Sequence, residues 1–141
     1  MPASNDKKDP RRGTTIAHIG IAVRDIAGAL PFYRDVLGLP DAPLDDADGA
    51  LISGFRAGDS LVELLQPNQS GSPVEKFLDK RGPGIHHICF AVDDIDFTLD
   101  RCRAAGIELI DQEPRRGAEG KRIAFLHPRS TGGVLVELSE Y

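Results

Sequence analysis

Residues 18–23 alternate between a face of large apolar side chains and a face of small residues that carries one histidine, which is the period of a β-strand. Ile19 and Ile21 fall on one face of this strand, whereas His18 and Gly20 fall on the opposite face, where the neighbouring side chains are small. Small neighbours leave room beside the imidazole for a ligand. An Asp and then apolar positions at helical spacing follow, so the pattern predicts a strand that leads into a helix.

The same pattern returns in the second half of the chain. His18-Ile-Gly-Ile-Ala-Val recurs as His87-Ile-Cys-Phe-Ala-Val, and Leu-Val-Glu63-Leu recurs as Leu-Val-Glu137-Leu. The two histidines are 69 residues apart and the two glutamates 74, so the second copy has gained about five residues within its turns. The match selects His87 rather than the adjacent His86 as the counterpart of His18. Two copies of one unit therefore fill nearly the whole chain.

Each predicted helix carries capping residues at both ends. Asp25 and Asp94 can accept hydrogen bonds from first-turn N–H groups, and Gly38 and Gly106 can adopt the left-handed conformation that closes a helix. Pro31 falls inside the first helix, where proline removes a backbone hydrogen bond and costs about 3 kcal/mol. We therefore expect a kink or a late start at this residue.

Three shorter β-prone stretches follow each helix, which makes each half a βαβββ module. They lie near Leu39 and at residues 50–55 and 60–65 in the first half, and at residues 108–110, 122–127 and 133–139 in the second. Between the halves, Ser72-Pro-Val-Glu75 is a capping box with proline at the first helical position. This motif predicts a short helix over residues 73–80.

These elements predict an α+β fold, in which two repeated βαβββ modules form one curved, cup-like mixed sheet with the helices outside. We expect a single domain over residues 15–140. Module one covers residues 15–66, the linker 67–84 and module two 85–140. Residues 1–14 are polar and basic without apolar periodicity, which is typical of a disordered tail.

The composition narrows the classes of partner. The chain has 141 residues, 40% of them hydrophobic, and a net charge of −5. These values support one compact domain and oppose binding to nucleic acid or to an anionic membrane. No apolar run approaches the roughly 20 residues that span a bilayer, so we expect a soluble, cytoplasmic protein. Cys89 and Cys102 fall inside a predicted strand and helix, which favours buried, reduced thiols over a disulfide.

Four candidate ligands repeat at matched positions: His18, Glu63, His87 and Glu137. Each Glu stands in an otherwise apolar strand, where an ionised carboxylate costs several kcal/mol of desolvation unless it is paired or coordinated. Imidazoles and carboxylates suit a divalent Co²⁺, Mn²⁺, Ni²⁺ or Zn²⁺ ion. We therefore predict that the four side chains converge on one metal inside the cup. His86 and His127 are assigned structural roles, because His86 has the wrong strand parity and His127 lies at a turn.

A glycine-rich, basic stretch follows in the second half. Five side chains there are candidates for binding phosphate or carboxylate groups: Arg115, Arg116, Lys121, Arg122 and Arg129. A solvated loop is the alternative interpretation. The chain contains no Gly-x-Ser-x-Gly, P-loop or dinucleotide-binding motif that would compete with the metal site.

The repeated His/Glu pattern resembles the vicinal oxygen chelate superfamily, which includes glyoxalases, bleomycin resistance proteins and dioxygenases. Four further segments are similar to the methylmalonyl-CoA epimerase family: Gly71-Ser-Pro-Val-Glu-Lys-Phe-Leu, Gly84-Ile-His-His-Ile, Asp111-Gln-Glu-Pro-Arg-Arg-Gly and Phe125-Leu-His-Pro-Arg-Ser-Thr-Gly-Gly-Val-Leu-Val-Glu-Leu. The match covers about residues 15–140, and its second half is the more specific.

The resemblance implies that His18, Glu63, His87 and Glu137 hold a divalent metal, with Co²⁺ the leading choice. It also implies interconversion of (R)- and (S)-methylmalonyl-CoA, an isomerase activity of propionate metabolism. Removal of the proton α to a thioester forms an enolate, which a divalent metal stabilises as a Lewis acid. The basic side chains of the second half would then hold the phosphates of coenzyme A.

The sequence differs from some members of the family at the position of the second acid/base residue. Some members carry a glutamate on the strand before the first Glu strand, and an ungapped comparison places Ile52 there. Asp46 and Asp48 are less suited, because their Asp-Asp-Ala-Asp-Gly context predicts a solvated turn. We therefore expect Glu137 and Glu63 to form the acid/base pair, with water as a further option.

Two other functions are compatible with this fold. A glyoxalase I-like lactoylglutathione lyase would use the same metal and the same enolate chemistry. A non-catalytic small-molecule binding protein is the second, although the four retained ligands argue against it. The pattern leaves open the native metal, a homodimeric state and the tolerance of other acyl-CoA substrates.

Overall fold

The computed structural model describes residues 13–141, and these divide into two compact units. One unit contains residues 18–86, and the other contains residues 87–141 together with 13–17. The predicted disordered tail lies outside the described residues, except for its last two positions. No helix of the described chain is long and apolar enough to cross a bilayer. The single domain over residues 15–140, with a linker between modules, stays a prediction.

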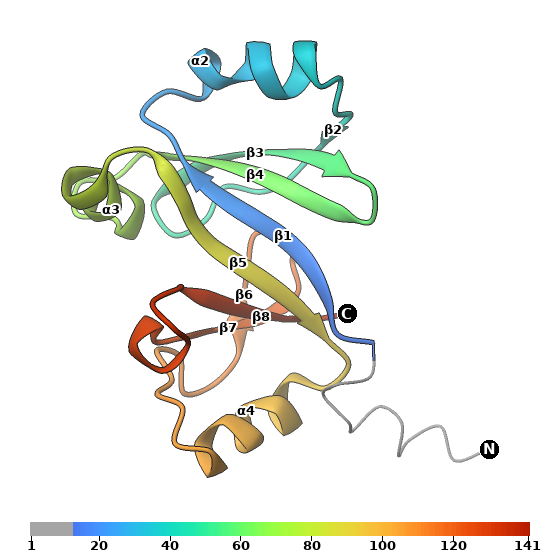
Figure 1. Cartoon of the computed structure of the whole chain (residues 1–141), viewed down its shortest axis with the longest axis vertical. Coiled ribbons are helices and arrows are strands. Elements are labelled where there is room, and N and C mark those ends of the chain that lie inside the picture. Colours follow the sequence, from blue (N-terminus) through green and yellow to red (C-terminus); the bar gives the residue numbers. More distant parts are fainter. Residues whose placement is uncertain (1–12) are drawn as a thin grey trace. The chain divides into compact units, whose positions relative to one another are not determined.

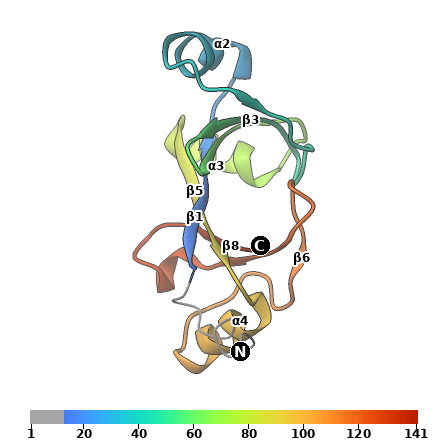
Figure 2. The same cartoon turned by 90° about the vertical axis from the view of Figure 1, so that its right-hand side faces the viewer.

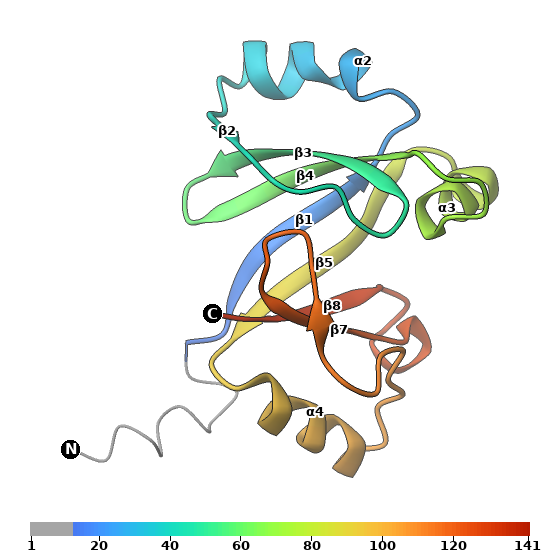
Figure 3. The same cartoon turned by 180° about the vertical axis from the view of Figure 1, so that it is seen from behind.

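The first module has the predicted βαβββ order. Its elements are β1 (Thr15–Ala22), α2 (Ile26–Leu30), the π-helical η1 (Pro31–Val36), β2 (Asp41–Ala42), β3 (Ala50–Ala57) and β4 (Ser60–Pro67). Its strands lie in the order β2-β3-β4-β1, with β1 parallel to β4 and the other pairs antiparallel. Figures 1 and 3 show α2 beside β3 and β4, and Figure 2 shows β3 bent into an arc.

The second module repeats this topology. Its elements are β5 (Gly84–Val92), α4 (Ile95–Ala104), β6 (Arg115–Arg116), β7 (Arg122–Leu126), the 3-10 turn η2 (Pro128–Ser130) and β8 (Val136–Glu140). The strand order is β5-β8-β7-β6, with β5 parallel to β8 and the other pairs antiparallel. The predicted α+β class, mixed sheet and internal repeat are therefore confirmed.

One predicted strand is wrong. Residues 108–110 form no strand; Leu109 makes a single isolated bridge to Leu126, and β6 takes the expected place in the sheet. The N–H of Glu108 donates to the hydroxyl of Ser130 at 3.0 Å instead of to a neighbouring strand. A side-chain acceptor here interrupts the backbone ladder that the apolar residues had suggested.

The helix boundaries follow the predicted signals. Asp25 accepts from the N–H of Ala27 at 3.3 Å, and Asp94 accepts from the N–H of Phe97 at 3.0 Å. Gly38 and Gly106 close their helices at φ values of 69° and 76°, in the region that favours glycine. The helix changes from α to π at Pro31, as expected where a residue without an N–H breaks the regular hydrogen-bond pattern.

The connecting helix is also confirmed, as α3 (Pro73–Arg81). Ser72 accepts from the N–H of Glu75 at 3.3 Å. The Glu75 carboxylate reaches back one residue further than in a standard capping box and accepts from the N–H of Gly71 at 2.7 Å. Both contacts satisfy donors that would otherwise be left over at a helix start.

Each module has its own apolar core. In the second module the core lies between α4 and the sheet and contains Val92, Ile95, Leu99, Leu109, Ala124, Leu126 and Leu138. In the first module it contains Ala22, Ala50, Leu65, Val74 and Leu78. Because Ala22 and Leu65 have the same strand parity as His18 and Glu63, the connecting helix α3 packs on the face of the sheet that carries the predicted ligands.

Leu99→Ala should lower the free energy of unfolding by about 2–5 kcal/mol, because it opens a cavity in the second core. Leu99 is 1% exposed, whereas Leu37 after η1 is 51% exposed. The matched change Leu37→Ala should therefore cost less than about 0.5 kcal/mol. Urea titration followed by circular dichroism measures both. Equal effects of the two substitutions would contradict the described core.

Candidate functional site

The period-two pattern of β1 and β5 places both predicted histidines on buried faces. On β1, His18, Gly20 and Ala22 are buried and the residues between them are half-buried. On β5, His87 and Cys89 follow the same rule. His18 is 4% exposed and His87 is 5% exposed. The face of small residues is therefore the buried one, which is why an imidazole fits there.

The two glutamates are buried on the neighbouring parallel strands. Glu63 on β4 is 2% exposed and Glu137 on β8 is 6% exposed, so neither lies on a solvated edge. Glu63 pairs in register with Gly20, and Glu137 pairs with Cys89. Each glutamate thus lies opposite the residue two positions after its histidine, and strand alternation turns both side chains to one face.

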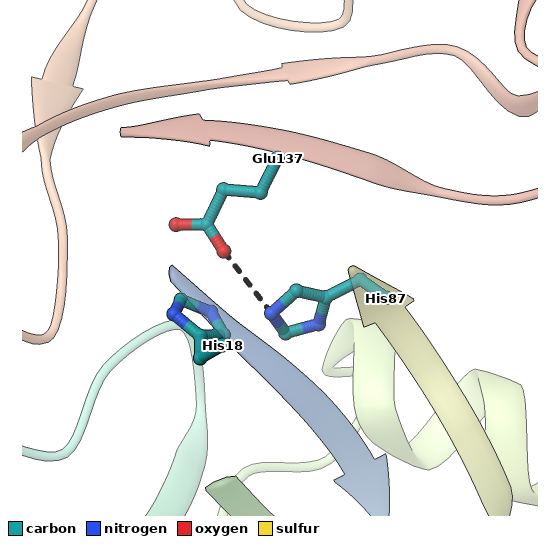
Figure 4. Close-up of side chains that lie close together, drawn as sticks. All are labelled: His18, His87 and Glu137. Carbon is teal, nitrogen blue, oxygen red and sulfur yellow. Dashed lines mark ion pairs between the residues drawn. The ribbon is translucent and has the colours of Figure 1, made fainter. Parts of the chain in front are cut away.

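The four residues form two pairs, one within each module. His18 Nδ1 lies 3.2 Å from Glu63 Oε2, and His87 Nε2 lies 3.0 Å from Glu137 Oε1. Figure 4 shows the Glu137 carboxylate directed at the His87 ring. A buried carboxylate against an imidazole nitrogen, present in both modules, is a donor set that fits a divalent cation of the Co²⁺ or Zn²⁺ type. The role of the four residues as ligands stays a prediction.

Phe125 is a neighbour of the second pair that the sequence pattern did not single out. It lies on β7 directly opposite Glu137, and its ring meets the His87 ring edge-on at a centroid distance of 5.6 Å. Only the pairing register of β7 with β8 identifies Phe125 as a site residue, because two residues directly opposite each other on neighbouring strands share a face of the sheet.

The first module replaces this aromatic residue with a glycine. Gly54 on β3 lies directly opposite Glu63. A Cβ at Gly54 would come within 2.6 Å of both the Ala42 carbonyl oxygen and Leu44 Cδ1, so only glycine fits there. The Leu44 side chain therefore lies over the position that an aromatic ring occupies in the second module.

The five predicted basic side chains differ in their contacts. Four lie on or beside the β6–β7 hairpin, and Arg129 lies on η2. Arg122 contacts both carboxylate oxygens of Asp96 at 3.0 and 3.1 Å, and Arg129 Nε lies 3.0 Å from Glu108 Oε1. Hydrogen bonding to Asp96 raises the pKa of Arg122 above its usual value. Their predicted contacts with substrate stay predictions.

The other three basic side chains have weaker or different partners. Arg116 donates to the Gly120 carbonyl at 2.9 Å, and Lys121 Nζ lies 4.0 Å from Glu119. Arg115 lies 3.1 Å from Asp111 and stands over the Phe125 ring. Arg116 and Lys121 therefore lie at the hairpin turn, where Arg116 contacts a backbone carbonyl and Lys121 makes a long contact with Glu119.

The other two histidines contact an aromatic ring and a helical turn, and both cysteines are free thiols. His86 is half-buried and meets Phe77 edge-on at 5.2 Å between ring centroids. The Nδ1 of His127 accepts from the N–H of Arg129 at 3.1 Å, so this ring caps η2. Neither Cys89 nor Cys102 forms a disulfide, and burial raises the pKa of the Cys102 thiol.

The segment before β3 is a turn, as its acidic sequence predicted. Asp48 has a φ of 54°, in the left-handed region. Ile52 is half-buried on β3, and its N–H donates to Asp46 Oδ1 at 2.9 Å. Asp46 thus ties the turn to strand β3 at Ile52. By the ungapped comparison, Ile52 is the position at which some family members carry a second glutamate.

Known proteins similar to this chain belong to one superfamily. Residues 17–125 match the glyoxalase/bleomycin resistance protein/dioxygenase superfamily. An ethylmalonyl-CoA/methylmalonyl-CoA epimerase from Cereibacter sphaeroides is 42% identical over 127 residues, which cover 87% of this chain and 95% of that protein. The human mitochondrial methylmalonyl-CoA epimerase is 38% identical, over 87% of this chain and 72% of its own length.

A solved structure agrees with these sequence relatives. A methylmalonyl-CoA epimerase in complex with methylmalonyl-CoA and NH4+ has a TM-score of 0.85 and is 37% identical, covering 90% of this chain and 94% of that one. The fold class and the family that the sequence predicted are both confirmed. The chain belongs to the methylmalonyl-CoA epimerase family of the glyoxalase/bleomycin resistance protein/dioxygenase superfamily.

Proposed function

We propose that this protein is an isomerase that interconverts (R)- and (S)-methylmalonyl-CoA. The observation that carries the proposal is the buried His–Glu contact that occurs in each module of a chain 42% identical to an epimerase. Burial of a carboxylate on an apolar strand costs several kcal/mol. Two such burials at matched positions indicate a chemical use rather than a structural one.

The metal site in this proposal joins the two pairs. His18, Glu63, His87 and Glu137 together hold one divalent ion, with Co²⁺ first and Mn²⁺, Ni²⁺ or Zn²⁺ as alternatives. The internal repeat supports it, because each repeated module supplies one His and one Glu at matched positions. When bound, the ion supplies a Lewis acid that stabilises the negative oxygen of the enolate.

The acid/base steps belong to the two glutamates. Glu137 removes the proton from C2 of the acyl group, so that the C–H bond breaks and a carboxyl O–H bond forms. Glu63 carries a proton at the start of turnover in this direction and then donates it to the opposite face of the same carbon, so that its O–H bond breaks as the new C–H bond forms. We assign this role to Glu63 because it is the counterpart of Glu137 in the sequence repeat. Apolar neighbours on both Glu strands limit the access of water to the proton.

Coenzyme A recognition falls to the β6–β7 hairpin. The net charge of −5 means that cations must be concentrated locally to hold phosphates. Arg116 and Lys121 at the hairpin turn are the leading contacts, and Arg115, Arg122 and Arg129 are further candidates. We also propose a cytoplasmic location and a homodimeric state.

Incubation of purified protein and Co²⁺ with methylmalonyl-CoA in D₂O should replace the C2 proton by deuterium and equilibrate the two stereoisomers. NMR follows the exchange, and chiral analysis of the acyl group follows inversion. The parallel sample receives the methylglyoxal–glutathione hemithioacetal. Turnover of that compound without C2 exchange would show a lyase, and activity on neither substrate would favour a binding protein.

Arg116→Ala and Lys121→Ala should each raise KM for methylmalonyl-CoA about fivefold at low salt, for a contact worth about 1 kcal/mol. The effect should shrink at high salt, because screening weakens exposed charge pairs. The rate constant kcat should stay near the wild-type value. Arg101→Ala on the outer helix α4 is the matched control. A fall in kcat alone would place these side chains in the chemistry instead.

Glu137→Gln and Glu63→Gln should each abolish inversion while leaving exchange on one stereoisomer, because each removes one member of the acid/base pair. The loss of inversion should be on the order of 100-fold or more. Metal content is measured first, so that loss of a ligand is separated from loss of a base. If Glu63→Gln keeps its metal and still inverts at the wild-type rate, Glu63 is only a ligand.

A further inference from the structure

The second His–Glu pair is supported by a line of contacts that begins at Asp111. One Asp111 oxygen accepts from the backbone N–H of Phe125 at 2.9 Å, and the other lies 3.1 Å from Arg115 Nε. The Arg115 guanidinium stands over the Phe125 ring, 5.6 Å from its centroid. The ring then meets His87 edge-on, with an angle of 77° between the planes.

Asp111 is well placed to fix this arrangement. Its side chain is 18% exposed, whereas that of Arg115 is 40% exposed. The same carboxylate therefore sets both the position of the strand at Phe125 and the direction of the guanidinium. A cation over the face of an aromatic ring contributes about 0.5–1 kcal/mol where it is partly exposed, and an edge-on aromatic pair contributes a similar amount.

The first module has a different residue at the place of this ring. Gly54 takes the place of Phe125 opposite Glu63, and the Leu44 side chain covers it. An aliphatic side chain lacks the ring edge and the cation that the second module provides. The two His–Glu pairs are thus matched in their ligands and unequal in their surroundings.

We propose that Asp111, Arg115 and Phe125 are positioning residues that hold the His87 imidazole in the rotamer that directs Nε2 at Glu137. This inference deepens the proposed function and rests on it for the metal. Partners around a ligating histidine fix its ring orientation, and their loss typically weakens metal binding by about 10- to 100-fold. Arg115 thus acts on the site through Phe125, besides its predicted contact with phosphate.

The chain contains its own control. Arg81 stands over the Phe77 ring at 5.8 Å, and that ring meets His86 edge-on at 5.2 Å between centroids. This is the same arrangement of guanidinium, phenyl ring and imidazole, built on a histidine that has the wrong parity to be a ligand. A general effect of removing such a ring on stability should appear equally at both places.

The experiment compares Phe125→Leu with Phe77→Leu in the full chain, with circular dichroism as the check on folding. NMR of the metal-free protein follows the His87 side chain through its imidazole resonances and its rotamer-dependent couplings. Competition with a chelator then gives the Kd for Co²⁺. Phe125→Tyr, which retains the ring edge, is the conservative variant, and Arg115→Met removes the cation while keeping an aliphatic stem.

Phe125→Leu should release His87 into several rotamers and raise the Kd for Co²⁺ about 10- to 100-fold. Phe125→Tyr should restore a single rotamer, and Phe77→Leu should leave both measurements near wild type. A single His87 rotamer in Phe125→Leu, or equal changes in Kd for Phe125→Leu and Phe77→Leu, would overturn the proposal. If Phe125→Leu does not fold, an ordered His87 in Arg115→Met overturns it instead.

The metal-free measurement separates this inference from the proposed function. A wild-type protein that binds no Co²⁺ would remove the metal site, whereas the rotamer of His87 would still decide the positioning role. Metal binding without epimerisation would remove the substrate assignment alone. The ordering of His87 by Phe125 would stand in either case.

Discussion

The contact between a buried carboxylate and a buried imidazole, made once in each module, is the interaction on which the rest of the site depends. Glu63 and Glu137 are 2% and 6% exposed, and each has apolar residues on both sides along its strand. Their desolvation is unfavourable unless a hydrogen bond, a proton or a cation compensates it. Strand parity and the parallel pairing of β1 with β4 and of β5 with β8 serve to place each carboxylate at its histidine.

The two modules share this contact and differ around it. In the first, the connecting helix α3 packs on the ligand-bearing face, and Gly54 leaves space that Leu44 fills. In the second, Phe125 stands opposite Glu137 and carries a guanidinium on its face. The two His–Glu pairs therefore have unequal surroundings, although the sequence around them repeats.

Much of the fold could be predicted because its signals are local. Strand alternation around His18 and His87, the Asp25 and Asp94 caps and the break at Pro31 each involve residues a few positions apart. Residues 108–110 were wrong as a strand, because the Ser130 hydroxyl competes for the N–H of Glu108 from a distant turn. The Asp96 partner of Arg122 and the place of Phe125 beside His87 depend on tertiary packing, which periodicity does not contain.

The most direct test of the central claim is the metal content of the chain, because two His–Glu pairs that share one ion differ from two independent sites. Elemental analysis of protein saturated with Co²⁺ and then desalted should give one ion per chain. His18→Ala and His87→Ala should each lose it, although each leaves the other module's pair intact. Two ions per chain, or full retention of the ion after either substitution, would contradict a shared site.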